Sequence, residues 1–328
     1  MHAEANPEYI RALSGFLAEE YGLRTKKILP AKRGFYGETW RVRAENGDYF
    51  LKIDYWKHHE REFRESLPVI RYMTDRGISF VPKIISTKAG GLYSRFRQGT
   101  AAVFEHVPGE LSENYSVGQL YRRLAEVYRL KTEGLALKTE DFGTRRLDVF
   151  RRLKDLPALP EGVKKALAEK RAVISGYMRR LQRFSALCKG KGDGFHITHG
   201  DAGGNCILGG ERLFIVDWDT VMAAPVERDA WIFICDDHEM EKIISALSEK
   251  GIRFAPDRNR LCFYCYDFFF HYLNEYLISV AEAENRVQKE KIAGELIGYL
   301  SDCWIYERLK KADAVDAVYC PEIPPLSP

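Results

Sequence analysis

The segment that decides the fold is ITHGDAGGNCILGGERLFIVDWD, residues 197–219, where a His-x-Asp, an Asn and a second Asp alternate with short apolar runs. The carboxylate of Asp201 can orient an attacking hydroxyl, whereas the Asn205 amide oxygen and the Asp217 carboxylate are hard ligands of the kind that Mg²⁺ prefers. The apolar runs predict two short hairpin strands, and the alternative interpretation is a plain hairpin with acidic turn residues. We favour a phosphoryl-transfer site, because a matching nucleotide-binding pattern precedes this segment in the chain.

Length and composition predict a globular protein with two lobes. The chain has 328 residues, 45% of them hydrophobic and 30% charged, which suffices for one large or two modest cores. Its net charge of +3 creates no field that favours nucleic acid or a membrane surface, so we expect neither as a partner. The sequence has no apolar run near the ~18 residues of a membrane span and no leader-like N-terminus, which predicts a cytoplasmic location. Its seven cysteines are an odd number and do not suggest a disulfide framework.

The N-terminal third predicts a helix followed by an antiparallel sheet. Residues 7–21 carry apolar side chains on one helical face, with Asn6 as the cap and Gly22 at the end. Residues 39–44 and 48–54 alternate polar and apolar side chains around an Asn-Gly pair, which indicates a β-hairpin.

The remaining pattern places more strands before a long helical region. We expect a helix within residues 58–76, which Pro68 must start or kink, and strands near 83–87 and 101–107. Pro108-Gly109 ends the last strand, and the helices expected after it are 116–131, 160–188, 227–250, 257–282 and 285–311. The predicted fold class is therefore α+β and bilobal. The N-terminal lobe spans residues 1–107 around an antiparallel sheet, and the larger, mainly helical lobe spans 108–328.

The turn between the first strands of this sheet predicts contact with phosphate. Gly34 and Gly37 leave backbone amides that can approach phosphate oxygens, although hairpin glycines often serve only to allow positive φ. Lys52 follows on the next strand between apolar neighbours, where an unpaired ammonium would be costly, unless it is an edge lysine that reaches solvent. We expect a carboxylate of the following helix to pair with it, either Glu65, our first choice, or Glu62. Such a pair would direct Lys52 at the α- and β-phosphates of a nucleotide.

The strand that ends at Pro108-Gly109 predicts the adenine site. At the expected junction between the lobes, the backbone carbonyl of Glu105 and the N–H of Val107 can pair with the adenine edge. Phe104 would line the pocket behind the base. This assignment depends on position in the chain more than on residue type.

In the order of its motifs, the chain resembles the aminoglycoside phosphotransferase and choline kinase family over about residues 25–310. The most specific portion is THGD at 198–201 joined to IVDWDTVMAAPVERDAW at 215–231, which is similar to the spectinomycin-phosphotransferase branch. The resemblance implies a protein-kinase-like fold in which residues 1–107 form the nucleotide-binding lobe and residues 108–328 the catalytic and substrate-binding lobe.

The resemblance also implies a role for individual residues. Asp201 would be the catalytic carboxylate, Lys52 the phosphate clamp, and Asn205 and Asp217 the Mg²⁺ ligands. Two further residues would support the catalytic loop, His199 and Asp229.

One departure from the family pattern concerns the catalytic loop. In the kinase signature the Asn follows the catalytic Asp by about five positions, whereas Asp201 and Asn205 are four positions apart. Gly203-Gly204 can adopt backbone angles closed to other residues, so the shorter path can still deliver the Asn205 amide. If it does not, Mg²⁺ would depend on Asp217 and water, and activity would be weak or absent. Asp219 could then serve as a substitute ligand, although its default role is a solvated or capping acid.

The second lobe offers two candidate acceptor surfaces. The run DDHEME at 236–241 supplies Asp236, Asp237 and Glu239, an acidic patch suited to a cationic acceptor, although helix starts favour acids in any case. Along the aromatic run at 263–276, Asp267 and His271 begin a stripe that can bind hydroxyls or amines, and core packing is the alternative.

These observations predict an ATP- and Mg²⁺-dependent phosphotransferase that moves the γ-phosphoryl group to a hydroxyl of a small polar molecule. The expected acceptor is an aminoglycoside or aminocyclitol. The alternatives are a kinase of another metabolite, such as a choline-like compound or a sugar, and a catalytically silent kinase-like binding or structural module. A metal-dependent hydrolase is disfavoured, because Lys52 and the glycine turn would have no purpose. The oligomeric state is open, with a monomer favoured.

Overall fold

The computed structural model describes residues 6–31, 37–112, 114–192, 194–210, 212–283 and 285–319. By internal contacts the chain forms two compact units. Unit 1 comprises Met1–Thr139, His196–Ala223 and Glu249–Ile252, and unit 2 comprises Glu140–Phe195, Ala224–Ser248 and Arg253–Pro328. An antiparallel sheet in unit 1 and a mainly helical unit 2 confirm the α+β class. The lobe boundary expected at residue 108 stays a prediction.

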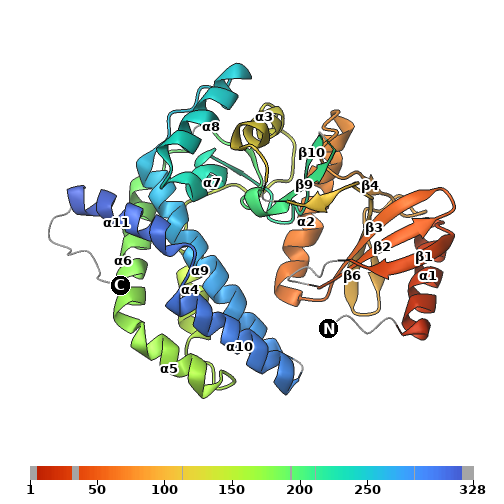
Figure 1. The fold of residues 1–328 in the computed structure, drawn as a ribbon, viewed down its shortest axis with the longest axis horizontal. Coiled ribbons are helices and arrows are strands. Elements are labelled where there is room, and N and C mark those ends of the chain that lie inside the picture. The colour runs from red at the N-terminus through yellow and green to blue at the C-terminus, as the bar shows by residue number, and fades with distance from the viewer. Residues whose placement is uncertain are drawn as a thin grey trace. The chain divides into compact units, whose positions relative to one another are not determined.

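The main sheet of unit 1 is antiparallel throughout (Figure 1). Its strand order is β1-β2-β3-β6-β4, and β5 pairs with β6 beside this path. The strands are β1 (Thr25–Pro30), β2 (Gly37–Ala44), β3 (Gly47–Asp54), β4 (Ile84–Ile85), β5 (Ser94–Phe96) and β6 (Gly99–Glu105). The β2–β3 hairpin is the one that the Asn-Gly pair predicts, and its register places Lys52 opposite Thr39.

Helix α1 (Pro7–Tyr21) covers one face of this sheet. The Asn6 side chain accepts the N–H of Glu8, and Gly22 ends the helix with a φ of 70°, as the sequence predicts. The buried side of α1 joins one apolar cluster with Leu51 and Ile53 of β3. Because side chains alternate along a strand, the residue between them, Lys52, faces away from this cluster.

Helix α2 (Lys57–Asp75) confirms the helix expected within residues 58–76. Pro68 lies inside the helix, so of the two expectations for this residue the one that it starts the helix is wrong. A proline in this position removes one backbone hydrogen bond. The burial of an apolar stripe that includes Phe63, Leu67 and Ile70 offsets this loss. Helix α2 contacts β3 and β4.

The segment quoted at the outset folds within unit 1 as two short pairings. Strand β8 (His196–Thr198) pairs with β11 (Met222–Ala224), and the hairpin of β9 (Cys206–Gly209) and β10 (Arg212–Ile215) forms a three-stranded sheet with β7 (Glu110–Leu111). The hairpin was predicted, but β7 was not. A short 3₁₀ turn, η1 (Gly203–Asn205), precedes β9, and helix α3 (Val117–Tyr128) contacts β8.

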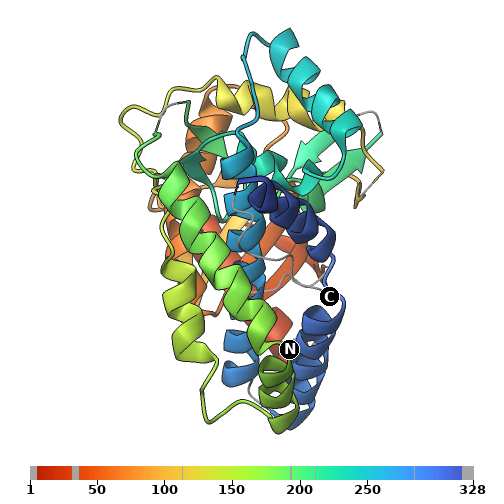
Figure 2. The ribbon, with the colours of Figure 1, turned by 90° about the vertical axis from the view of Figure 1, so that its left-hand side faces the viewer.

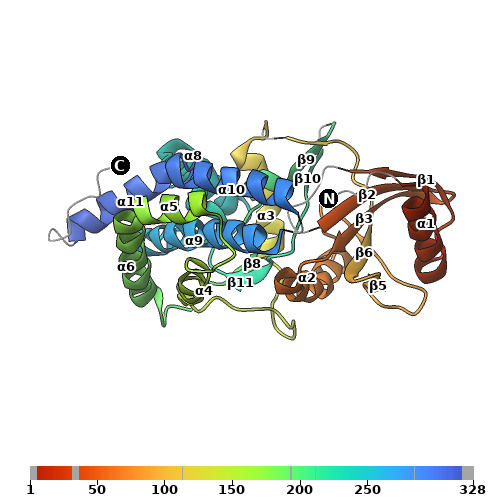
Figure 3. The ribbon, with the colours of Figure 1, turned by 90° about the horizontal axis from the view of Figure 1, so that it is seen from below.

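Unit 2 is built around one long helix, α9 (Arg258–Glu282), which contacts α4, α6, α10 and α11 (Figure 3). Figure 2 shows the green helix α6 lying over the blue α9. Fifteen residues of α9 are buried, including most of its aromatic run. The helices around it are α4 (Arg145–Leu153), α5 (Glu161–Glu169), α6 (Arg171–Cys188), α7 (Glu227–Ala230), α8 (Asp237–Glu249), α10 (Arg286–Ser301) and α11 (Tyr306–Tyr319), with the 3₁₀ turn η2 (Trp231–Phe233).

The helix predictions for unit 2 were right in place but too coarse. Single helices expected at 160–188 and 285–311 are each divided in two, at Lys170 and at 302–305, and the one expected at 227–250 is divided into α7, η2 and α8. Helix α4 was not predicted. Burial of Cys303 and Ile305 accompanies the second interruption, which local propensity does not reveal. Within the described ranges, no helix combines the length and apolarity that a membrane span requires.

Candidate active site

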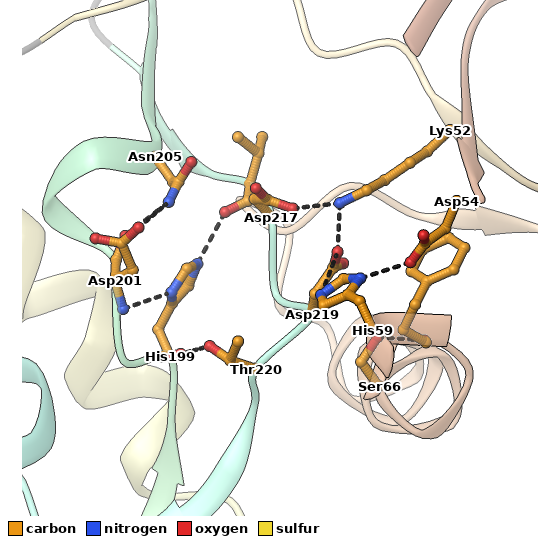
Figure 4. A network of polar contacts seen from close by, with 12 residues as sticks. Lys52, Asp54, His59, Ser66, His199, Asp201, Asn205, Asp217, Asp219 and Thr220 are labelled. Atoms are coloured by element: carbon orange, nitrogen blue, oxygen red, sulfur yellow. Dashed lines mark hydrogen bonds and ion pairs between the residues drawn. The ribbon is translucent and has the colours of Figure 1, made fainter. Parts of the chain in front are cut away.

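Lys52 lies between two carboxylates that follow strand β10 (Figure 4). Its Nζ donates to Asp217 Oδ1 at 2.5 Å and also to Asp219 Oδ2. The lysine side chain is 14% exposed, and its ammonium lies 5.4 Å from the centre of the Phe63 ring. Burial alone would lower the pKa of Lys52, but the charges of the two carboxylates outweigh it and raise the pKa above its ordinary value. The site therefore favours the charged form of a largely buried lysine.

The two carboxylates differ in their surroundings. The Asp217 side chain is 47% exposed, whereas that of Asp219 is 9% exposed. Burial opposes ionisation of Asp217, yet the adjacent Lys52 charge holds its pKa below the ordinary value. For Asp219, burial and the neighbouring Asp217 charge together raise the pKa. Asp217 also has a φ of 64°, a left-handed conformation that is uncommon for a residue with a side chain but tolerated by Asp.

The ion pair expected between Lys52 and helix α2 is not the one that forms. Glu65, our first choice, accepts from Arg61 Nε at 2.7 Å, and Glu62, the alternative, accepts from Lys138 Nζ at 3.2 Å. Both expectations are therefore wrong. The buried stripe of α2 that includes Phe63 faces Lys52, and positions one before and two after Phe63 are rotated away from it.

Helix α2 contributes a histidine instead, which sequence reasoning missed. His59 lies one turn before Phe63 and is 3% exposed. Its Nδ1 is 2.5 Å from Asp54 Oδ2, and its Nε2 is 3.7 Å from Asp219 Oδ2. Burial would lower the pKa of His59, but the bond to Asp54 and the charge of Asp219 raise it overall. A usable signal was present, because His59 occupies a position of the buried stripe and Asp54 follows Lys52 on the same strand face.

The loop that carries Asp201 is held by His199, which is fully buried. Its Nδ1 accepts the backbone N–H of Asp201 at 3.1 Å, and its Nε2 donates to the Val216 carbonyl at 2.8 Å. These two bonds require a neutral ring with the proton on Nε2. The Thr220 hydroxyl donates to the His199 carbonyl at 2.9 Å. His199 thereby ties the residue that we expect to be the catalytic carboxylate to the strand end before Asp217.

The short loop from Asp201 to Asn205 closes as a 3₁₀ turn. The Asn205 N–H donates to the Ala202 carbonyl at 3.1 Å, and the Asn205 amide Nδ2 donates to the Asp201 carbonyl at 2.8 Å and to its Oδ2 at 3.3 Å. The special backbone angles expected of Gly203-Gly204 are not used, because neither glycine has a positive φ. The left-handed residue is Gly200, with a φ of 92°. The 3₁₀ turn therefore brings Asn205 back to Asp201 although only three residues separate them.

The oxygens in this region fit a hard divalent cation. The Val216 N–H donates to the Asn205 carbonyl at 2.9 Å, which fixes Asn205 beside the residue before Asp217. The amide nitrogen of Asn205 is engaged with Asp201, so its amide oxygen is the atom offered to a ligand. Within the described ranges, no three His, Cys, Asp or Glu side chains are placed to hold a metal ion by themselves. Mg²⁺ would therefore need nucleotide oxygens and water as well, which is its usual coordination in kinases.

Three of the residues expected to contact the rest of a nucleotide, Gly37, Phe104 and Glu105, lie on β2 and β6. Gly37 begins β2, and a Cβ added there would lie 1.9 Å from the Ile53 carbonyl oxygen, so the strands approach closely at this point. Gly34 lies outside the described residues. Phe104 is buried in β6, which ends at Glu105, two residues before Val107. Their contacts with the base stay predictions.

Four of the five acceptor residues expected in unit 2 have local partners. Asp236 accepts the N–H of Glu239 at 2.9 Å, and Glu239 pairs with Lys242 at 2.7 Å, as acids at a helix start do. Asp237 is the first residue of α8. Asp267 is buried and pairs with Arg146 at 2.5 Å, and the ring of His271 packs against Phe268. Their role as acceptor ligands stays a prediction, as does the supporting role of Asp229, which is buried in α7.

Comparisons with known proteins show that the fold occurs in several phosphotransferases. A crystal structure of spectinomycin phosphotransferase with ADP and spectinomycin is 18% identical, with a TM-score of 0.73, covering 92% of this chain and 98% of that chain. The microcompartment-associated aminopropanol kinase is 15% identical, with a TM-score of 0.64 over 92% and 98%. Macrolide 2'-phosphotransferase from Brachybacterium faecium is 15% identical, with a TM-score of 0.57 over 87% and 97%. A comparison with curated proteins gives no match.

A family model described as the phosphotransferase enzyme family matches residues 27–264, more than half of the chain. This match confirms the resemblance seen in the sequence and the predicted enzyme class. The chain belongs to the phosphotransferase enzyme family.

Proposed function

We propose that this protein transfers the γ-phosphoryl group of a nucleoside triphosphate, ATP by first choice, to a hydroxyl group of a small polar molecule. The observation that carries the proposal is the 2.5 Å contact between Lys52 Nζ and Asp217, with Asn205 and Asp201 fixed beside them. A buried cation next to a half-exposed carboxylate is the pair of charges needed to hold nucleotide phosphates and a metal.

The residues divide the work by charge. Asp217 and the Asn205 amide oxygen would hold Mg²⁺, which neutralises charge that develops on the phosphate oxygens. Lys52 binds the α- and β-phosphates. Asp201 is exposed and carries an oxygen that accepts or orients the proton of the acceptor hydroxyl. His199 holds the backbone of Asp201 and thereby fixes where that carboxylate points.

For the acceptor, we propose an aminocyclitol or aminoglycoside first, and a small amino alcohol or sugar second. The structural neighbours include proteins described as acting on spectinomycin, on macrolides and on aminopropanol. All of these are hydroxyl compounds, and the phosphate clamp proposed here does not depend on which of them is bound.

The experiment is a panel of hydroxyl acceptors incubated with the protein, ATP or GTP, and Mg²⁺. We expect one acceptor class to gain a single phosphoryl group, detected by mass spectrometry, and we expect EDTA to stop the reaction and added Mg²⁺ to restore it. Asp201→Ala is the matched control, because it should abolish transfer while nucleotide affinity is retained. Failure of the folded protein to consume either nucleotide with any acceptor would reject the proposal in favour of a silent kinase-like module.

A further inference from the structure

We propose that Asp219, positioned by His59 and Asp54, is the partner that keeps Lys52 in place while a metal-bound nucleotide occupies the site. In this chain these residues would replace a glutamate of helix α2. The inference rests on the proposed function and adds positioning residues to it.

The first step concerns which carboxylate can leave Lys52. Under the proposed function an oxygen of Asp217 coordinates the metal, and the metal's charge then competes with the Lys52 ammonium for that carboxylate. Asp217 can make this exchange because its side chain is 47% exposed. Asp219 cannot turn to solvent, because its side chain is 9% exposed. Asp219 therefore remains as the anion beside Lys52 when the site is loaded.

The second step concerns what holds Asp219. His59 Nε2 lies 3.7 Å from Asp219 Oδ2 on the side away from Asp217, and the ring is fixed by the 2.5 Å contact of its Nδ1 with Asp54 (Figure 4). Asp54 is itself fixed, because its Oδ1 accepts the N–H of Trp56 at 2.8 Å. The Asp54 and His59 side chains are 0% and 3% exposed. A buried chain of polar contacts thus runs from the end of β3 to Asp219.

The third step concerns why these polar contacts also position Lys52. Lys52 and Asp54 are two residues apart on β3 and share one face of the strand. Helix α2 begins at Lys57, so His59 in its first turn closes the short connection back onto that same face. One turn later, Phe63 covers the ammonium. Strand and helix therefore locate Lys52 and Asp219 together, a task that Glu65 and Glu62 do not perform.

The test compares two substitutions that keep different halves of the histidine. His59→Asn retains a polar atom near the Nδ1 position that contacts Asp54 but cannot reach Asp219, whereas His59→Gln extends towards the Nε2 position. Nucleotide affinity is measured by calorimetry on the full chain with ATP and Mg²⁺, and again with ATP and EDTA. His58→Asn, on the exposed neighbour, is the matched control, and thermal unfolding confirms that each variant is folded.

With Mg²⁺, we expect His59→Asn to weaken ATP binding about tenfold and His59→Gln at most about threefold, since one polar contact to the Asp219 carboxylate is lost or kept. With EDTA, the difference should shrink, because Asp217 then stays with Lys52. Equal ATP affinity of His59→Asn and wild type, or equal losses in both variants with and without Mg²⁺, would overturn the inference alone. Wild type that binds neither ATP nor GTP with Mg²⁺ would overturn the proposed function with it.

Discussion

Two regions of the molecule bury a cation against carboxylates, and they differ in exposure. In unit 1, Lys52 lies between Asp217 and Asp219, and the Asp217 side chain is 47% exposed. In unit 2, Arg180 Nε lies 2.9 Å from Asp313 Oδ1, and these side chains are only 3% and 9% exposed.

The two clusters also differ in the backbone that carries them. Arg180 and Asp313 belong to helices α6 and α11, and Tyr266 of α9 completes their cluster by donating to Asp313. Asp217, in contrast, follows a strand and has a left-handed φ of 64°. A cluster closed on all sides links helices and has no open position for a ligand, whereas a cluster with one exposed, strained member can exchange partners. We infer that the Arg180 cluster stabilises the fold and that the Lys52 cluster binds a ligand.

The largest effect should come from Asp217→Asn, which keeps the shape and tolerates the left-handed backbone. We expect phosphoryl transfer to fall about 10³-fold, or about 4 kcal/mol of barrier, because a charged metal ligand is lost. The free energy of unfolding should change by less than about 1 kcal/mol, since the side chain is half exposed. Initial rates and urea unfolding measure the two quantities, and full activity in the variant would remove the distinction between the clusters.

The converse substitution is Arg180→Met. It leaves Asp313 buried without its cation, which should lower the free energy of unfolding by about 3 kcal/mol. Because the Arg180 cluster has no open position for a ligand, transfer rates measured under conditions where the variant is folded should stay within about twofold of wild type. That factor corresponds to ~0.4 kcal/mol of barrier. The double variant Arg180→Met with Asp313→Met should regain most of the stability. A loss of transfer rate without a loss of stability would show instead that Arg180 takes part in function.

A smaller effect is expected from Gly37→Ala, which tests the strand that positions Lys52. The added Cβ would lie 1.9 Å from the Ile53 carbonyl oxygen, so β2 must move away from β3 at a cost of about 2 kcal/mol. Gly15→Ala is the matched control, because a Cβ there meets nothing within 4 Å. Urea unfolding midpoints compare the two, and a midpoint equal to that of the control would show that the close approach is not required.

The smallest effect concerns pH and His196, outside both clusters. Its Nδ1 contacts the Tyr128 carbonyl at 2.8 Å, and burial lowers its pKa more than this bond raises it. The unfolded chain therefore binds more protons, so this contribution to stability is present above a pH of about 6.5 and declines as the pH falls towards the lowered pKa. We expect a decline below about 1 kcal/mol that is reduced in His196→Gln. Parallel stability–pH curves for the two proteins would contradict this assignment.

Much of the candidate site could be located from the sequence, because its residues belong to motifs that are local in the chain. The spacing of Asp201, Asn205 and Asp217 around a hairpin, and Lys52 within an alternating strand, depend only on periodicity and turn residues. The same local rules gave α1 with its Asn6 cap. The family match over residues 27–264 agrees with what those motifs implied.

What the sequence did not determine was which side chains meet across elements. Lys52 could pair with any acid that the fold brought near, and position on the next helix along the chain favoured Glu65 or Glu62. Only the tertiary structure decided in favour of Asp219, because the packed stripe of α2 turns His59 and Phe63 towards the lysine. Motifs follow from the order of residues along the chain, whereas partners follow from the rotation and packing of whole elements, which many distant contacts set together.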